Sequence, residues 1–191
     1  KEAIAFSDKN FLMPNGDYLP YVTKLFLNLY SFNTDMSQKF FSRGDSRVAK
    51  TAKGNIGGSI CTGFMSPDTN RKMTKDGAEI LISASSDAPF HGSQNLLRQI
   101  MAMTKFRAIE NRRYFGQATN MGYSFLIDSK GKFVEKSSTL GIGILFTDAK
   151  LLNIETTYTK LGDWVVFVAV FVLLSFLFIC LTKNAIINRI K

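Results

Sequence analysis

The sequence predicts an α+β fold, a mixed α/β sandwich followed by one C-terminal transmembrane helix. Strand-like and helix-like segments alternate from residue 55 onward and then give way to a run of strands, which is typical of layered α/β domains. Near the C-terminus, residues 164–181 read WVVFVAVFVLLSFLFICL, which is 18 residues without a charge. As a helix, such a run spans about 27 Å, close to the hydrocarbon thickness of a bilayer.

The composition excludes several classes of protein. Of the 191 residues, 46% are hydrophobic, which is too many for a disordered chain. Two cysteines exclude a disulfide scaffold and a structural zinc cluster of cysteines. The single histidine, His91, excludes sites that need two histidines. We therefore expect no metal and no cofactor.

The first third of the chain has few regular elements. Residues 1–6 are compatible with a short strand, and Pro and Asn-Gly break the structure of residues 11–20. Residues 21–32 are dense in aromatics and leucine, so we expect an amphipathic helix or a loop that touches lipid, with ordinary core packing as the alternative. Residues 42–54 are polar and predict a loop or hairpin.

The elements of the central part follow in order. Residues 55–61 (NIGGSIC) predict a buried strand that ends at Cys61. Ser66 and Pro67 have the form of an N-cap and first helical position, and that helix should end near Gly77.

Further strands flank a long helix. We expect a buried strand over 79–83, and a helix over 93–111 with one apolar side formed by Leu97, Ile100, Met101, Thr104 and Ala108. The remaining predicted strands are 114–119, 123–127, 132–135 (entered through a turn at 128–131) and 140–146.

The apolar run divides the chain into an extramembrane domain (1–160), a membrane helix (164–182) and a basic tail (183–191). The tail has three basic residues and no acid, so the positive-inside rule places it in the cytoplasm and the domain on the other side. The net charge of +9 leaves +6 outside the tail, which suits anionic lipid head groups. No nucleic-acid-binding motif accompanies this charge, so we expect no nucleic acid partner.

Cys61 is the candidate nucleophile. A side chain at a strand end lies at the rim of a sheet, where a substrate can reach it. The alternative is a buried cysteine with a packing role only. Cys180 lies inside the apolar run, so we expect no disulfide with Cys61.

Several segments of the sequence together resemble apolipoprotein N-acyltransferase, a family of the nitrilase (carbon–nitrogen hydrolase) superfamily. Residues 9–20 (KNFLMPNGDYLP) are similar to its K-x-x-L-x-P-x-G-[ED]-x-x-P stretch. The later segments that agree, in the family's order, are FSRG at 41–44, IC at 60–61, SSDA at 85–88, RAIE at 107–110 and ATNMG at 118–122.

The resemblance implies a nitrilase-type α-β-β-α sandwich, of which this chain holds the C-terminal portion. It also implies a Glu–Lys–Cys triad, with Cys61 as the nucleophile and Lys9 as the triad lysine. Asp17 aligns with a family carboxylate and would orient Lys9 or an incoming amine, although a turn residue is the equal alternative. The family's general-base Glu lies upstream of this chain. Thr62 and Gly63 stand where the family commonly has Tyr and Glu.

The implied reaction moves a fatty acyl group from a membrane phospholipid through a Cys61 thioester to the α-amino group of a lipoprotein diacylglyceryl-cysteine. The implied location is the extracytoplasmic face of the bacterial inner membrane. Two alternatives stay open: a membrane-tethered amidase, and a degenerate module that binds lipid or protein without turnover. Arg107 and Glu110 should form a structural ion pair, and His91 should be a loop residue, with a Cys61–His91 dyad as the alternative.

Overall fold

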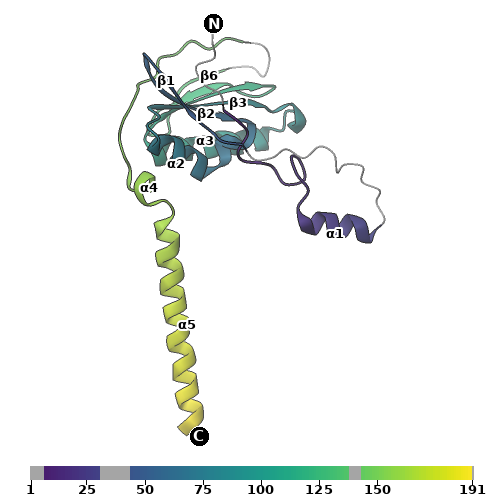
Figure 1. Cartoon of the computed structure of the whole chain (residues 1–191), viewed down its shortest axis with the longest axis vertical. Helices are drawn as coiled ribbons and strands as arrows, with labels where there is room; N and C mark the ends of the chain where they lie inside the picture. The colour runs from purple at the N-terminus through teal and green to yellow at the C-terminus, as the bar shows by residue number, and fades with distance from the viewer. Residues whose placement is uncertain (1–6, 31–43, 138–142, 191) are drawn as a thin grey trace.

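The computed structural model describes residues 7–30, 44–137 and 143–190, and of residues 184–190 it describes only the backbone. A six-stranded sheet lies at the opposite end of the structure from the C-terminus (Figure 1). Its strands are adjacent in the order β1-β2-β3-β4-β5-β6. Their bounds are β1 Val48–Thr51, β2 Gly54–Ile60, β3 Ile80–Ser86, β4 Tyr114–Asn120, β5 Phe125–Ile127 and β6 Phe133–Lys136. The three central strands are parallel, and the flanking pairs are antiparallel.

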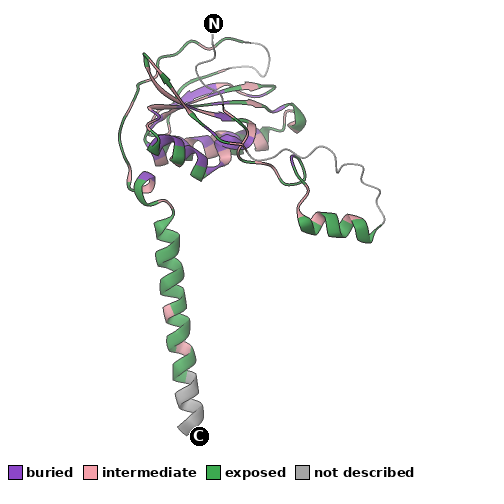
Figure 2. Cartoon of the chain, in the orientation of Figure 1, coloured by how far each residue is buried: buried purple, intermediate pink, exposed green. Residues whose placement is uncertain are grey.

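Two helices cross between the parallel strands, α2 (Pro67–Lys75) and α3 (Gln94–Asn111). Both crossovers step in the same direction along the sheet, and such crossovers are almost always right-handed, so both helices lie on one face. The apolar core lies between these helices and the sheet, and Met73, Leu81 and Phe115 are fully buried there (Figure 2).

The sequence signals for these helices are confirmed. The Ser66 side chain caps α2 by accepting a hydrogen bond from the Thr69 amide at 3.2 Å, and Pro67 is the first helical residue. The predicted apolar side of α3 faces the core through Leu97, Ile100, Thr104 and Ala108, and Met101 is partly buried.

No helix among the described residues covers the opposite face of the sheet. Along β3, Leu81 and Ser83 are buried on the helix side, whereas Ile82 on the other side is 43% exposed. The expectation of a fully buried strand at 79–83 is therefore correct for one face only. A groove of about 630 Å³ runs over this second face, and Ile82 and Ile144 are among the residues that line it.

Some of the predicted strands are absent or lie outside the described residues. The predicted strand at 140–146 is wrong for residues 143–146, which cross the sheet as an irregular segment, and its other residues lie outside the described ranges. The predicted strand at 1–6 and the Phe-Ser-Arg of the segment at 41–44 also lie outside them. Within 42–54, where a loop or hairpin was expected, residues 48–51 form β1, and the antiparallel hairpin that β1 makes with β2 extends beyond this range.

A linker joins the sheet to the last two helices, α4 (Thr157–Leu161) and α5 (Trp164–Ile190). Arg113 is fully buried and donates to the carbonyls of Ala78 at 2.6 Å and Ile154 at 2.7 Å, which ties the linker to the segment just before β3 begins. Arg71 of α2 donates to three consecutive carbonyls of α4, those of Tyr158, Thr159 and Lys160, at 3.1–3.2 Å. The domain therefore holds the chain firmly just before α5 begins.

α5 begins at Trp164 and extends away from the domain (Figure 1). Its window Trp164–Lys183 is long and apolar enough to cross a membrane, and none of it is buried against the rest of the chain. The hydroxyl of Ser175 donates to the Phe171 carbonyl at 2.8 Å, so it is satisfied within the helix, as a lipid environment requires. The helix continues to Ile190 and includes most of the segment expected to form a tail.

α1 (Tyr21–Leu29) is the amphipathic helix that the sequence predicts, and it contributes nothing to the core. None of its residues is buried, and Tyr21 and Leu29 are 80% and 77% exposed. Figure 1 shows it standing to one side of the sheet. The alternative of ordinary core packing is wrong within the described residues, because the side chains of α1 have no apolar partner layer.

Candidate functional site

Cys61 lies at the carboxyl end of β2, where it begins a 3₁₀ turn (Cys61–Met65, η2). Its backbone φ is +52°, a left-handed conformation that is uncommon for a residue other than glycine and that clusters at functional sites. The side chain is partly exposed and carries a free thiol. Since β2, β3 and β4 are parallel, their carboxyl ends meet at this same edge of the sheet.

Lys9 belongs to an irregular segment that runs beside the end of β2. The Ser7 hydroxyl donates to the Gly58 carbonyl at 2.8 Å, which fixes the start of this segment against β2. The Gly44 amide donates to the Lys9 carbonyl at 3.1 Å, and the Asp8 amide donates to the Asp45 carbonyl at 3.0 Å. These bonds bring Lys9 next to Cys61 in space, although the two residues are far apart in the sequence.

Asp17 forms an ion pair with Lys9, with 2.5 Å between Nζ and Oδ2. The same Oδ2 accepts a hydrogen bond from the Met13 amide at 2.7 Å, so Asp17 also closes the Asn-Gly turn in which it lies. Both interpretations of Asp17, partner of Lys9 and turn residue, therefore hold together. Burial alone would raise the pKa of Asp17, but the hydrogen bonds from Lys9 and Met13 outweigh it and lower that pKa.

The Lys9 ammonium interacts with Cys61 as well as with Asp17. Burial alone would lower the pKa of Lys9, but the hydrogen bond and charge of Asp17 and the corresponding interactions with Cys61 outweigh it and raise that pKa. Lys9 is therefore a firmly charged ammonium between a carboxylate and a thiol. The structure thus brings together all three residues that the sequence singled out.

Two further side chains hold the Lys9 segment in place: Thr62 of the turn η2, and Asn10, whose side-chain amide reaches α2. The Thr62 hydroxyl donates to the Phe11 carbonyl at 2.6 Å. The Asn10 amide donates to the Thr69 hydroxyl at 2.9 Å. The sequence marked Thr62 only as a departure from the family's Tyr and did not mark Asn10, and adjacency to Cys61 and to Lys9 is the further signal that points to them.

Two of the quoted motifs meet at the same edge of the sheet. Asp87, which follows β3, is buried, and its amide donates to the Asn120 carbonyl at 2.8 Å. A Cβ at Gly122 would overlap Oδ2 of the buried Asp87 carboxylate, so glycine is the residue that fits there. Burial raises the pKa of Asp87, although a hydrogen bond with Thr119 partly opposes this. The segments SSDA and ATNMG are thus one packed unit.

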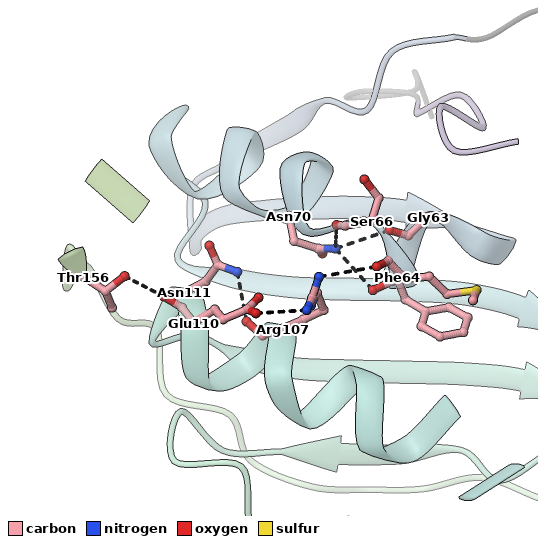
Figure 3. A network of polar contacts seen from close by, with 9 residues as sticks. Gly63, Phe64, Ser66, Asn70, Arg107, Glu110, Asn111 and Thr156 are labelled. Atoms are coloured by element: carbon pink, nitrogen blue, oxygen red, sulfur yellow. Dashed lines mark hydrogen bonds and ion pairs between the residues drawn. The ribbon is translucent and has the colours of Figure 1, made fainter. Parts of the chain in front are cut away.

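Arg107 and Glu110 form the predicted structural ion pair, at 2.9 Å and one helical turn apart (Figure 3). Arg107 also donates to the Met65 carbonyl at 3.4 Å, and Asn70 donates to the carbonyls of Gly63, Phe64 and Ser66. Through these bonds, α2 and α3 hold the turn that follows Cys61. Burial raises the pKa of Glu110, and the Asp163 charge adds to this while Arg107 opposes it.

His91 takes no part in this arrangement. His91 is exposed in a left-handed conformation after the short turn Ala88–Phe90 (η3), and its imidazole makes no hydrogen bond or ion pair within the described ranges. Nothing there supports a Cys61–His91 dyad. No group of three or more His, Cys, Asp or Glu side chains that could hold a metal occurs among the residues that the structure describes.

The sequence profile of the carbon–nitrogen hydrolase family matches residues 8–158. The chain belongs to the carbon–nitrogen hydrolase family. Curated relatives named apolipoprotein N-acyltransferase include one from Geobacter metallireducens, 30% identical over 85% of this chain. Apolipoprotein N-acyltransferase 1 of Treponema denticola is 30% identical over 92% of it.

The matches cover only 30% and 32% of these two relatives, so the chain spans about a third of the length of the curated relatives it matches. Among solved structures, a carbon–nitrogen hydrolase from Helicobacter pylori G27 is similar, with a TM-score of 0.48 and 21% identity. That likeness covers 53% of this chain and 43% of the other.

Proposed function

We propose that this chain is the nucleophile-bearing portion of an apolipoprotein N-acyltransferase. The observation that carries the proposal is the Asp17–Lys9–Cys61 arrangement: a partly exposed thiol on a strained turn, beside an ammonium that a carboxylate fixes in place. The relatives named apolipoprotein N-acyltransferase supply the class of reaction.

The first step is formation of a thioester. A nearby cation favours the thiolate, which is the nucleophilic form of cysteine. The Cys61 sulfur attacks the ester carbonyl of a phospholipid, and the Lys9 ammonium stabilises the negative charge that develops on the carbonyl oxygen. The carbon–oxygen bond to glycerol then breaks, and the proton that the Cys61 thiol gave up to the general base when the thiolate formed passes to the glycerol oxygen, so that a lysophospholipid leaves.

The second step transfers the acyl group to an amine. The α-amino group of a diacylglyceryl-cysteine lipoprotein attacks the thioester carbonyl, the carbon–sulfur bond breaks, and an amide forms as the amine loses a proton. We assign that proton transfer to a general-base Glu that the family resemblance places upstream of residue 1. A thioester suits this step because it is more reactive toward amines than an oxygen ester.

We also propose that α5 crosses the inner membrane, with the domain on the extracytoplasmic face and the basic C-terminal residues in the cytoplasm. The apolar window Trp164–Lys183 supports the membrane crossing, and the three basic residues and no acid within 183–191 support this orientation. α1 would be the arm that contacts lipid, since its apolar side chains are exposed and Pro20, which precedes it, is three residues from Asp17. Trypsin added to intact spheroplasts should then cleave the domain and leave α5 protected.

Residues 1–160 would form the C-terminal portion of a nitrilase-type sandwich. The uncovered face of the sheet, where Ile82 and Ile144 are exposed, is the support for this assignment, because a second sheet would bury it. In the full-length protein, a cysteine-reactive dye should therefore label Ile82→Cys much more slowly than it labels the same substitution at exposed Phe106.

Incubation of the full-length protein with labelled phospholipid tests the main proposal. We expect a hydroxylamine-sensitive acyl label on Cys61 that Cys61→Ala abolishes and an acceptor lipopeptide removes. Ammonia release from small amides without such a label would instead support a membrane-tethered amidase. Lipid binding with neither activity would indicate a module without turnover.

A further inference from the structure

The residue that follows Cys61 ties the cysteine turn to the segment that carries Lys9. Thr62 is 5% exposed, and its hydroxyl donates to the Phe11 carbonyl at 2.6 Å. Phe11 is only two residues from Lys9, so this bond fixes the Lys9 segment directly against η2. We propose that Thr62 is a positioning residue, which keeps the Lys9 ammonium beside the Cys61 sulfur.

The bond stands out among those that hold residues 7–11. Ser7, the Lys9 carbonyl and Asn10 make bonds of 2.8–3.1 Å to β2, to Gly44 and to α2. The Thr62 bond is the shortest of this set in the described structure, and it alone begins at the residue next to the nucleophile. A lysine side chain is long and flexible, so the position of its backbone decides whether its ammonium stays near one partner.

The chemistry of this position requires a short hydroxyl side chain. Thr62 Oγ1 lies one bond from Cβ, close enough to the backbone to reach a carbonyl on the adjoining segment, whereas a tyrosine hydroxyl stands at the far end of its ring. The turn is also tight at the next position, since a Cβ at Gly63 would lie 3.0 Å from Ser59 Cβ.

The test measures the reactivity of Cys61 toward iodoacetamide in the full-length protein, from about pH 6 to pH 9. A Cys180→Ala background leaves Cys61 as the only cysteine of this chain. Thr62→Val removes the hydroxyl but keeps the shape, and Thr62→Ser restores it. Thr74→Val is the matched control, because the Thr74 hydroxyl is equally buried and donates to the Asn70 carbonyl at 2.8 Å, within α2.

We expect Thr62→Val to slow alkylation about fivefold or more near neutral pH and to move the pH profile upward, because a displaced ammonium no longer favours the thiolate. Thr62→Ser and Thr74→Val should behave like the parent. Thr62→Ala serves as a second variant should Thr62→Val fail to fold. Equal slowing in Thr62→Val and Thr74→Val would overturn the proposal, because it would reflect a general loss of stability.

The proposal rests on the proposed roles of Cys61 and Lys9, and Lys9→Met in the same background separates the two. If Lys9→Met alkylates like the parent, the proposed Lys9–Cys61 pair fails. If Lys9→Met slows alkylation while Thr62→Val does not, the pair stands and the positioning role of Thr62 is overturned.

Discussion

The Asp17 carboxylate and the Lys9 ammonium, eight residues apart in sequence, meet at 2.5 Å beside the end of β2. The turn between them brings both side chains together, because the Met13 amide donates a hydrogen bond to the same Asp17 oxygen that contacts Lys9. Lys9 interacts with both Asp17 and Cys61, so the ion pair holds the ammonium beside the thiol.

Removal of the Asp17 charge should destabilise the protein and its site. Asp17→Asn leaves the Lys9 ammonium without its carboxylate, and the free energy of unfolding should fall by about 1–3 kcal/mol. Urea unfolding of the purified protein measures this change. Equal stability of the variant and the parent at neutral pH would show that the pair has no structural weight.

The cost of Asp17→Asn should depend on pH in a defined way. The pKa of Asp17 is lowered on folding, so its contribution is present above its unfolded pKa of about 3.9 and disappears as the pH falls through the folded value. The pKa of Lys9 is raised, so its contribution is present below about 10.4 and disappears as the pH rises past the folded value. The difference between parent and variant should therefore be constant between about pH 5 and 9 and vanish in acid. A difference that grows in acid would contradict this sign.

Arg71 should determine how firmly α4 is held before the membrane helix. Arg71→Ala removes three hydrogen bonds to the last carbonyls of α4 and should cost about 1–3 kcal/mol, or a few degrees in Tm. Limited proteolysis should then cut near Lys160 faster than in the parent. Lys72→Ala is the control, because Lys72 lies on the same helix but pairs with exposed Asp45. Similar proteolysis of both variants would rule out the clamp.

Gly122 should tolerate no side chain. A Cβ there would overlap the buried Asp87 carboxylate, so Gly122→Ala should cost about 1–3 kcal/mol through overpacking. Gly143→Ala is the control, since no atom lies within 4 Å of the corresponding Cβ. Thermal unfolding compares the two, and an unchanged Tm for Gly122→Ala would mean that the contact between the two motifs is loose.

The exposed face of α1 should lie in lipid when the protein is in a bilayer. A fluorophore on Phe26→Cys, in a background without other cysteines, should be quenched strongly by nitroxide-labelled lipid in proteoliposomes. Phe106→Cys on α3 is the matched control, because the two phenylalanines are 58% and 59% exposed. Equal quenching at both positions would show that α1 has no special contact with lipid.

Local signals in the sequence predicted the elements well where they rest on chemistry close along the chain. Ser66-Pro67 marked the start of α2, and the apolar spacing of 93–111 marked the buried side of α3, because capping and helical periodicity are local properties. The irregular course of residues 143–146 was missed because a short apolar run looks alike in a strand and in an extended segment.

The sequence likewise predicted the residues of the site but not the contacts between them. The predicted strand end singled out Cys61, and the family resemblance added Lys9 and Asp17, but neither revealed what holds the three residues together. The bonds from Thr62 to Phe11 and from Asn10 to Thr69 join segments more than 50 residues apart, and no local pattern records them. The contact of Gly122 with Asp87 likewise exists only once β3 and β4 are paired.

Trapping of an acyl-enzyme on Cys61 tests the central claim most directly. The full-length protein is incubated with phospholipid carrying a labelled acyl chain and is then analysed by mass spectrometry of the peptide that contains Cys61. The proposed mechanism predicts a thioester on Cys61 that is absent in Cys61→Ala, is strongly reduced in Lys9→Met and is discharged by a lipopeptide amine. If the full-length Cys61→Ala variant transferred acyl groups to the lipopeptide as well as the parent does, that result would contradict the mechanism.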